Sequence, residues 1–390
     1  MSAPAIDEKR VSWAELFVDL VFVFAVTEVS TLIEEDHSWP GLLRALVVFV
    51  PLYWMWVGTA VWTNLHDMTR PGPRLTIFGI ALAAIFMALA LPRAFENLGL
   101  LFAFAYWAGR IVLGAGAFRR SRRHGSFPLT PPTVSMVVTG PILVLGAFAD
   151  AGFREAVWAV AAVIELAMPS LLRGRLRNLR LDAGHLTERF GLFVLIALGE
   201  SVVQIGASAQ SARHQTVGVG FAVAAAFGLS CGLWWVYFHF AADAMRHSLA
   251  TATIQIDITR LVLSYGHLSF ISAIILAAVG MRHAVAHPGD PLGWSIAAIL
   301  FGGVGLYLAS FGFTRWAMFR LISVTRLVAA GAVLLLLPAA AYAPALASLT
   351  GAAIVVAALN IVELLRVGHT GWRARSGRAG DGPTAGTRPG

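Results

Sequence analysis

The chain has 390 residues, 58% of them hydrophobic and 13% charged, and its mean hydropathy is +0.74. Soluble proteins carry about 25% charged residues, so this composition excludes a soluble protein and predicts a polytopic membrane protein. The formal charge of +8 comes from arginine, since Lys9 is the only lysine, and the single cysteine, Cys231, excludes an intrachain disulfide.

Twelve apolar runs follow one another along the chain. A helix of about 20 residues crosses the roughly 30 Å of hydrocarbon in a bilayer, so each run is a candidate transmembrane helix of an all-α protein. The first run carries Glu15 and Asp19 and lacks a small-residue cleavage site, which argues against a cleaved signal peptide. The runs cover approximately residues 12–33, 41–64, 75–93, 98–118, 134–149, 156–172, 187–209, 217–241, 259–281, 293–312, 322–341 and 346–366.

Arginines mark one side of the predicted membrane region. The loops on the side of both termini hold most of the cations, including Lys9 and Arg189, whereas the opposite loops hold few, among them Arg282. Cytoplasmic loops are enriched in Lys and Arg, so we expect both termini in the cytoplasm. Orientation accounts for these cations, and no nucleic-acid partner is expected.

The first half of the chain is echoed in the second. Glu15-Leu-Phe returns as Glu188-Arg-Phe, and we expect both glutamates near the cytoplasmic surface. Six runs in each half make the predicted repeats parallel, as in many transporters. Further matches pair Glu28 with Glu200, Asn64 with Asp243, and Glu165 with Glu363. The predicted organisation is a first six-helix repeat (1–172), a basic cytoplasmic linker (173–186), a second six-helix repeat (187–366) and a disordered Arg/Gly-rich tail (367–390).

Carboxylates inside the predicted helices are the main functional candidates. An Asp at a helix centre costs about 2.5–3.5 kcal/mol on insertion scales, so each needs an explanation. Asp19 and Glu28 lie on opposite sides of the first helix, which is therefore expected to be central, and Glu200 lies in the middle of the seventh. We predict an ion- or substrate-binding site formed by Asp19, Glu28, Glu200, Ser201, Asn64 and Asp243.

Other polar residues support narrower predictions. His267 with Tyr265 is a candidate proton relay, although a core histidine with satisfied hydrogen bonds is the alternative. Aromatic residues along the second and eighth runs either anchor the membrane interface or line a cavity. No nucleotide or metal motif is present, so no cofactor is expected. Structural ion pairs are expected between Arg110 and Glu165 and between Asp257 and Arg260.

Several of these segments resemble one known family. The segments are Glu15-Leu-Phe-Val-Asp-Leu-Val-Phe-Val23, Glu188-Arg-Phe-Gly-Leu-Phe193, Leu198-Gly-Glu-Ser201 and Ser264-Tyr-Gly-His-Leu268. They are similar to signatures of the bacterial low temperature requirement protein A family, and the resemblance covers most of residues 11–366. It implies a multi-span protein of the bacterial inner membrane and implies no substrate.

The leading functional hypothesis is a proton- or cation-coupled secondary transporter that uses the intramembrane carboxylates. Its expected partners are membrane lipids and a small ion or small-molecule substrate, with a homodimer as a further possibility. The alternatives are an ion channel whose pore is formed by the first helices of the two repeats, an intramembrane enzyme acting on a lipid or isoprenoid, and a scaffold without a ligand. Enzymatic activity is the less favoured of these.

Overall fold

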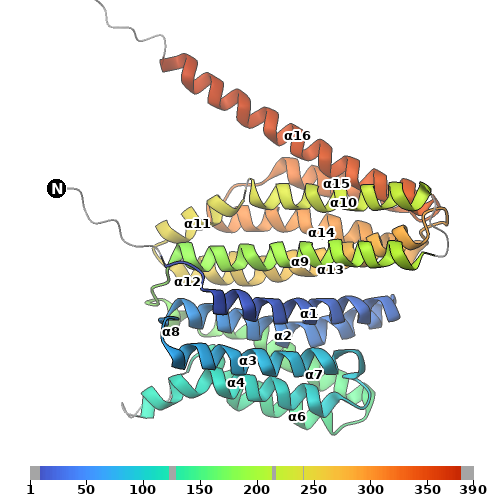
Figure 1. The fold of residues 1–390 in the computed structure, drawn as a ribbon. Coiled ribbons are helices and arrows are strands. Elements are labelled where there is room, and N and C mark those ends of the chain that lie inside the picture. Colours follow the sequence, from blue (N-terminus) through green and yellow to red (C-terminus); the bar gives the residue numbers. More distant parts are fainter. Residues whose placement is uncertain (1–8, 123–128, 213–216, 240, 379–390) are drawn as a thin grey trace, which may run out of the picture.

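The computed structural model describes residues 9–122, 129–212, 217–239 and 241–378. Within these ranges the chain is helical apart from short connections and one isolated bridge between Pro291 and Pro344. The long helices lie side by side in one bundle, with α1 to α7 in one part and α9 to α16 in the other (Figure 1). This agrees with the expected all-α class.

The first helix begins at a clear sequence signal. At the start of α1, the Ser12 hydroxyl accepts from the Glu15 amide, while the Glu15 carboxylate accepts from the Ser12 amide at 2.9 Å. This reciprocal capping satisfies two backbone donors that the helix leaves free. The elements are α1 (Trp13–Glu35), α2 (Trp39–Asn64), α3 (Pro71–Ala90), η1 (Leu91–Arg93), α4 (Gly99–Arg122), α5 (Pro131–Val134), η2 (Ser135–Thr139), α6 (Gly140–Ala147) and α7 (Ala151–Leu171).

The second half contains one helix with a long π-helical segment. Here α12, η3 and α13 form a continuous helix in which η3 widens the turns just before His267. Such segments often occur at functional sites. The elements are α8 (Arg173–Leu176), α9 (Ala183–Ser211), α10 (Val217–Phe238), α11 (Ala242–Thr251), α12 (Gln255–Ile258), η3 (Thr259–Gly266), α13 (His267–Ala286), α14 (Trp294–Phe319), α15 (Val324–Ala340) and α16 (Ala345–Arg378).

Eight helical segments in the described residues are long and apolar enough to cross a membrane. They lie in α1, α2, α3, α9, α10, α13, α14 and α16 with their adjoining turns, and three shorter apolar segments lie in α4, in α5 to α6, and in α15. Each range expected from the sequence overlaps a helix, with α7 in the position of the sixth. The chain is therefore a multi-pass membrane protein. The tail was expected from residue 367; α16 is described to Arg378, and residues 379–390 of the expected tail lie outside the described residues.

Helices in the two halves contact one another in the same order. In the first half, α1 packs on α3, α3 on α4, α4 on α6, α6 on α7, α7 on α2, and α2 on α1. In the second half, α9 packs on α13, α13 on α14, α14 on α15, α15 on α16, α16 on α10, and α10 on α9. The halves meet where α1 contacts both α9 and α13.

In the second half, the backbones of α13 and α14 approach each other closely. A Cβ added at Gly303 of α14 would lie 2.8 Å from the Ala277 amide nitrogen and 2.9 Å from the Ala273 carbonyl oxygen of α13. Small residues at such contacts let helix backbones approach each other, which drives association within a bilayer. The α13–α14 pair therefore forms a rigid support behind the surface that α13 presents to the first half.

Candidate functional site

A fully buried ionic cluster joins the two halves. Arg189 of α9 lies between two carboxylates of α1: its Nη1 is 3.0 Å from Glu15 Oε1, and its Nη2 donates to Asp19 Oδ1. Nη1 also donates to the Thr63 hydroxyl at 3.0 Å. Glu15, Asp19 and Arg189 all have 0% exposed surface. We call Glu15, Asp19, His185 and Arg189 the Arg189 cluster.

Hydrogen bonds around Asn64 fix the state of His185. The Asn64 Oδ1 accepts from the Asp182 amide at 3.0 Å, so the amide nitrogen of Asn64 faces the Asp182 carbonyl at 2.9 Å and His185 Nδ1 at 3.1 Å. His185 Nδ1 is therefore an acceptor, and the ring is neutral with its proton on Nε2. That Nε2 lies 3.1 Å from Glu15 Oε1.

Three buried polar atoms of the cluster have no hydrogen-bond partner among the described residues: Arg189 Nε, His185 Nε2 and one carboxylate oxygen, Asp19 Oδ2. The Oδ1 of Asp19 accepts from Trp56 Nε1 at 2.8 Å as well as from Arg189, whereas its Oδ2 accepts from no donor in the part of the chain that the structure describes. With His185 neutral, two carboxylates face one guanidinium. If both carboxylates were ionised, the cluster would hold an uncompensated negative charge away from water, which is strongly unfavourable.

Lys9 closes the end of the bundle nearest this cluster. Its ammonium donates to three carbonyl oxygens at the end of α2: Thr63 at 2.5 Å, Asn64 at 3.0 Å and His66 at 2.6 Å. A cation at a helix C-terminus satisfies the free carbonyls and the helix dipole. Burial lowers the pKa of Lys9 from its usual range, although Glu15 and Asp182 act in the opposite direction.

A second polar cluster lies further along the same interface. Glu200 Oε1 accepts from the Thr27 hydroxyl at 2.6 Å and from Gln204 Nε2 at 2.7 Å. Gln204 Oε1 in turn accepts from Arg282 Nη1 at 2.6 Å, and Arg282 pairs with Glu34 of α1. We call Glu34, Glu200, Gln204 and Arg282 the Arg282 cluster. It also joins α1 to α9 and α13.

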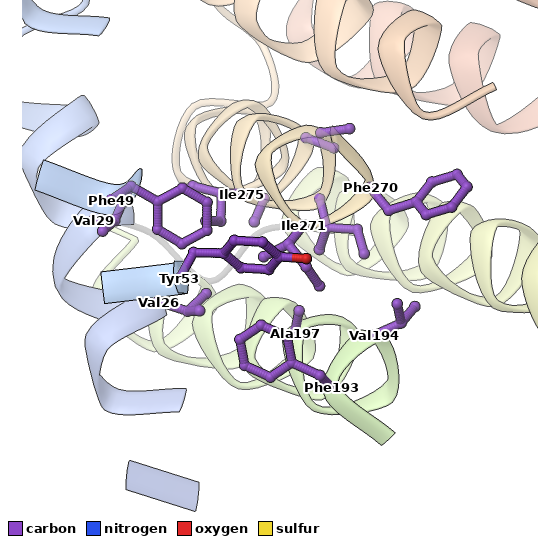
Figure 2. Close-up of a cluster of buried hydrophobic side chains, with 14 of the residues drawn as sticks. Val26, Val29, Phe49, Tyr53, Phe193, Val194, Ala197, Phe270, Ile271 and Ile275 are labelled. Carbon is purple, nitrogen blue, oxygen red and sulfur yellow. The ribbon is translucent and has the colours of Figure 1, made fainter. Parts of the chain in front are cut away.

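Apolar side chains separate the two clusters. Arg189 and Glu200 lie about 16 Å apart along the axis of α9, at roughly 1.5 Å per residue. Figure 2 shows the side chains that meet there from α1, α2, α9 and α13, with the Tyr53 ring among them. They are completely or almost completely buried. They are Val26, Val29, Phe49, Tyr53, Phe193, Val194, Ala197, Phe270, Ile271 and Ile275.

The two expected relay residues have different surroundings. His267 Nδ1 lies 3.0 Å from the Val262 carbonyl oxygen, so Nδ1 carries a proton, and Nε2 is hydrogen-bonded to the Tyr237 hydroxyl at 2.6 Å. Tyr265 instead donates to the Leu166 carbonyl at 2.5 Å, away from His267. His267 is thus paired with Tyr237, a residue that the sequence did not single out for this role.

The structure brings only some of the expected binding residues together. Asp19 and Asn64 belong to the Arg189 cluster or its surroundings, and Glu200 belongs to the Arg282 cluster. Ser201 is buried but donates to the Ala197 carbonyl of its own helix at 3.0 Å. Glu28 is half-buried with no hydrogen-bond partner among the described residues, and Asp243 is exposed in the first turn of α11.

The expected ion pairs lie outside both clusters. Arg110 Nη2 is 2.9 Å from Glu165 Oε2, and both side chains are buried. Asp257 is 3.6 Å from Arg260, but its stronger partner is Arg173, whose Nη2 lies 2.6 Å from Asp257 Oδ2. In the second half, Arg326 Nε lies 2.8 Å from Glu363 Oε1.

Two expectations about surface charges were wrong. Glu15 is completely buried rather than at the cytoplasmic surface, whereas Glu188 is exposed. Arg189 is not a loop cation, because α9 begins at Ala183 and turns this side chain into the interface. A signal was present in the sequence: His185 and Arg189 are four residues apart, as are Glu15 and Asp19, and each pair shares a helix face.

The described residues include no group of three or more His, Cys, Asp or Glu side chains that could hold a metal ion. Carboxylates arranged in this way at the interface can bind and release a proton or a small cation. The interface contains buried carboxylates in excess over guanidinium groups, and two separate places where α1 meets the second half.

Comparisons with known proteins agree with the resemblance seen in the sequence. The model of the family described as bacterial low temperature requirement A protein (LtrA) matches residues 10–361. Uncharacterized protein RA0937 of Rhizobium meliloti (strain 1021) is 32% identical over 320 residues, which cover 80% of this chain and 77% of that protein. No solved structure matches the chain.

Proposed function

The chain belongs to the bacterial low temperature requirement A family, and from this premise we propose that it is a proton- or cation-coupled secondary transporter of the bacterial inner membrane. The observation that carries the proposal is the Arg189 cluster, in which Asp19 and Glu15 share one guanidinium at the contact between the halves. Intramembrane carboxylates at the interface of two repeats are typical of transport sites.

We propose that the chain crosses the membrane twelve times, with both termini in the cytoplasm, as two parallel six-helix repeats. The shared order of helix contacts in the two halves supports this duplication. Under this orientation the Arg189 cluster lies toward the cytoplasm and the Arg282 cluster toward the outside. Reporter fusions at residues 178 and 342 test it: the first should be cytoplasmic, and the second, in the loop between α15 and α16, should face outward.

The proposed mechanism is alternating access between the two clusters. The Arg189 cluster closes the cytoplasmic side, the Arg282 cluster closes the outer side, and the apolar side chains of Figure 2 separate them. Opening one cluster at a time would expose Asp19 or Glu200 to one side only. Such rocking of one half against the other is the usual transport motion of repeat-built proteins.

The test is flux in proteoliposomes under an imposed pH gradient, measured with a pH-sensitive dye inside the vesicles. Glu200→Gln and Asp19→Asn should each abolish coupled flux, because each removes an ionisable carboxyl from the interface. Glu188→Gln, which changes an exposed carboxylate on the same helix as Glu200, should leave flux unchanged. If Glu200→Gln and Asp19→Asn both leave all flux unchanged, the carboxylate mechanism is wrong.

A further inference from the structure

We propose that the Arg189 cluster binds one proton, and that this proton sits on Oδ2 of Asp19. The inference rests on the proposed transport function and names its coupling ion. It also assigns a separate role to each member of the cluster. Asp19 carries the proton, Arg189 holds Glu15, and His185 stays neutral.

The charge balance is the first support. Asn64 fixes the tautomer of His185, so His185 contributes no positive charge. Arg189 is then the cation in direct contact with Glu15 and Asp19, all three with 0% exposure, while Lys9 interacts with Glu15 from the end of α2 and not with Asp19. A proton on Asp19 makes the cluster neutral, whereas full ionisation leaves a buried net charge, for which proteins have no compensation without water or a counterion.

The position of the proton follows from the hydrogen bonds. Glu15 is fully supplied with donors: Oε2 accepts from the Ser12 amide and hydroxyl at 2.9 and 2.8 Å, and Oε1 accepts from Arg189. These bonds favour its ionised form. On Asp19, Oδ1 accepts from Trp56 and Arg189, but Oδ2 has no donor among the described residues. A proton on Asp19 Oδ2 therefore costs less free energy than a proton on Glu15, which would lose the hydrogen bonds that favour its ionised form.

The donor set disfavours a metal cation as the ligand. Hard cations bind several oxygen ligands at once. The groups that contact Asp19 are the indole N–H of Trp56 and the guanidinium of Arg189, which donate protons and repel a cation. The charged groups that interact with Asp19 are Arg189 and Glu15.

The other helices packed on α1 add no further charge at Asp19. Arg74, the only ionisable residue of α3, donates to the Met68 carbonyl at 2.7 Å. On the η3–α13 side, His267 is bonded to Tyr237 and the Val262 carbonyl, and it is not among the charged groups that interact with Asp19. The ionisation of Asp19 is therefore governed within the Arg189 cluster itself.

Proton loss would then drive the opening of the cytoplasmic side. When the proton on Asp19 leaves to water, no other bond breaks, and the cluster acquires one net negative charge. Separation of α1 from α9 would hydrate that charge. Binding of the proton restores a neutral cluster and closes the contact again.

Infrared difference spectroscopy on the full chain in lipid nanodiscs tests this assignment. Raising the pH should remove a C=O band of a protonated carboxyl, and Asp19→Asn should lack that band while Glu200→Gln keeps it. Adding NaCl at constant pH should not change the band. In Trp56→Phe the band should move to higher frequency, because the C=O at Oδ1 loses a hydrogen bond, and this readout remains if Asp19→Asn fails to fold.

Three results would each overturn the assignment: a band that persists in Asp19→Asn, a band that keeps its frequency in Trp56→Phe, or a band that sodium removes at constant pH. The spectra do not depend on transport. If the Asp19 band is present but coupled flux is absent, the proton site stands and the proposed transport function is wrong. If coupled flux is present but the Asp19 band is absent, the transport function stands and the proton site is wrong.

Discussion

Arg189 and Glu15 are 174 residues apart in the chain, yet their side chains lie 3.0 Å apart in the interior, where neither is exposed. The pair joins the first helix of one half to the first long helix of the other. Because a buried charge without its partner is costly, this contact ties the stability of the interface to its ionic state.

We predict that Arg189→Gln lowers the stability of the protein by about 3–5 kcal/mol, the usual cost of removing one partner of a buried ion pair. Glu15 would be left without its counter-charge, and Asp19 would lose one of the two donors to its Oδ1. The apparent Tm in nanodiscs, followed by tryptophan fluorescence, measures the loss. The double variant Glu15→Gln/Arg189→Gln should recover part of it, and Arg175→Gln, at an exposed position, should have little effect. Equal effects of Arg189→Gln and Arg175→Gln would contradict the prediction.

A second prediction concerns the contact between Tyr53 and the π-helical segment. The Tyr53 hydroxyl donates to the Ser264 carbonyl at 2.8 Å across the two halves. Tyr53→Phe should cost about 1 kcal/mol, the typical net value of a hydrogen bond, and should speed amide hydrogen exchange in residues 259–266. The matched control is Tyr307→Phe, which removes a 2.9 Å bond to the Leu233 carbonyl within the second half. Tyr307→Phe should not speed amide exchange in residues 259–266. If both variants speed this exchange equally, the Tyr53 bond has no special role in holding the π-helical segment.

Sequence patterns were sufficient to predict the helical framework. Apolar runs of the length of a bilayer mark the helices, because the hydrocarbon forces backbone groups to bond within each segment. The sequence also identified Asp19 and Glu200, since a carboxylate inside an apolar run stands out in any membrane sequence. The family assignment followed from segments around the same residues.

Partners across the interface could not be predicted in the same way. Arg189 was counted as a loop cation because it is close to the start of its run, and only the rotation of α9 turns it inward. Gln204 and Arg282 form a chain with Glu200 only because α9 and α13 lie side by side. Such pairings depend on helix rotation and depth, which a single sequence does not specify.

The buried Arg110–Glu165 pair allows a third prediction. Arg110 also donates to the Tyr106 hydroxyl at 3.0 Å, and Tyr106 donates to Glu165 at 2.5 Å, so three side chains form one network within the first half. Arg110→Met or Glu165→Leu alone should destabilise by about 3–5 kcal/mol, and the double variant should cost less than the sum. Thermal unfolding of all four proteins gives the coupling. Additive effects would show that the two residues act independently.

Lys9 gives a fourth prediction. Its ammonium makes three bonds to carbonyls at the end of α2, and the side chains of Thr63 and Asn64 hold Arg189 and His185. Lys9→Met should therefore destabilise by about 1.5–3 kcal/mol, the range for a hydrogen bond to a charged group, and should speed amide exchange near residues 63–66. Arg10→Met, which changes the neighbouring exposed cation, is the control. Unchanged exchange in Lys9→Met would show that these bonds do not hold the end of α2.

The Arg282 cluster is predicted to act as the outer closure of the transport path. Arg282 pairs with Glu34 and reaches Glu200 through Gln204, so its loss should let α1 separate from α13 at this end. Cys231 is the only cysteine, and Cys231→Ser provides a background for a single probe. Ser30→Cys, at a position with 3% exposure, should be protected from a membrane-impermeant maleimide added outside, and Arg282→Gln should increase its labelling rate at least several-fold.

The matched control is Arg44→Gln, because Arg44 pairs with Glu155 at 2.8 Å at the same end but within the first half. It should leave Ser30→Cys protected, whereas Glu34→Gln should expose it as Arg282→Gln does. The labelling is measured without any substrate, so it reports the closure itself. Equal labelling in the Arg282→Gln and Arg44→Gln proteins would mean that the ion pair between the halves has no special role at this end, and that the outer barrier is formed by the apolar side chains alone.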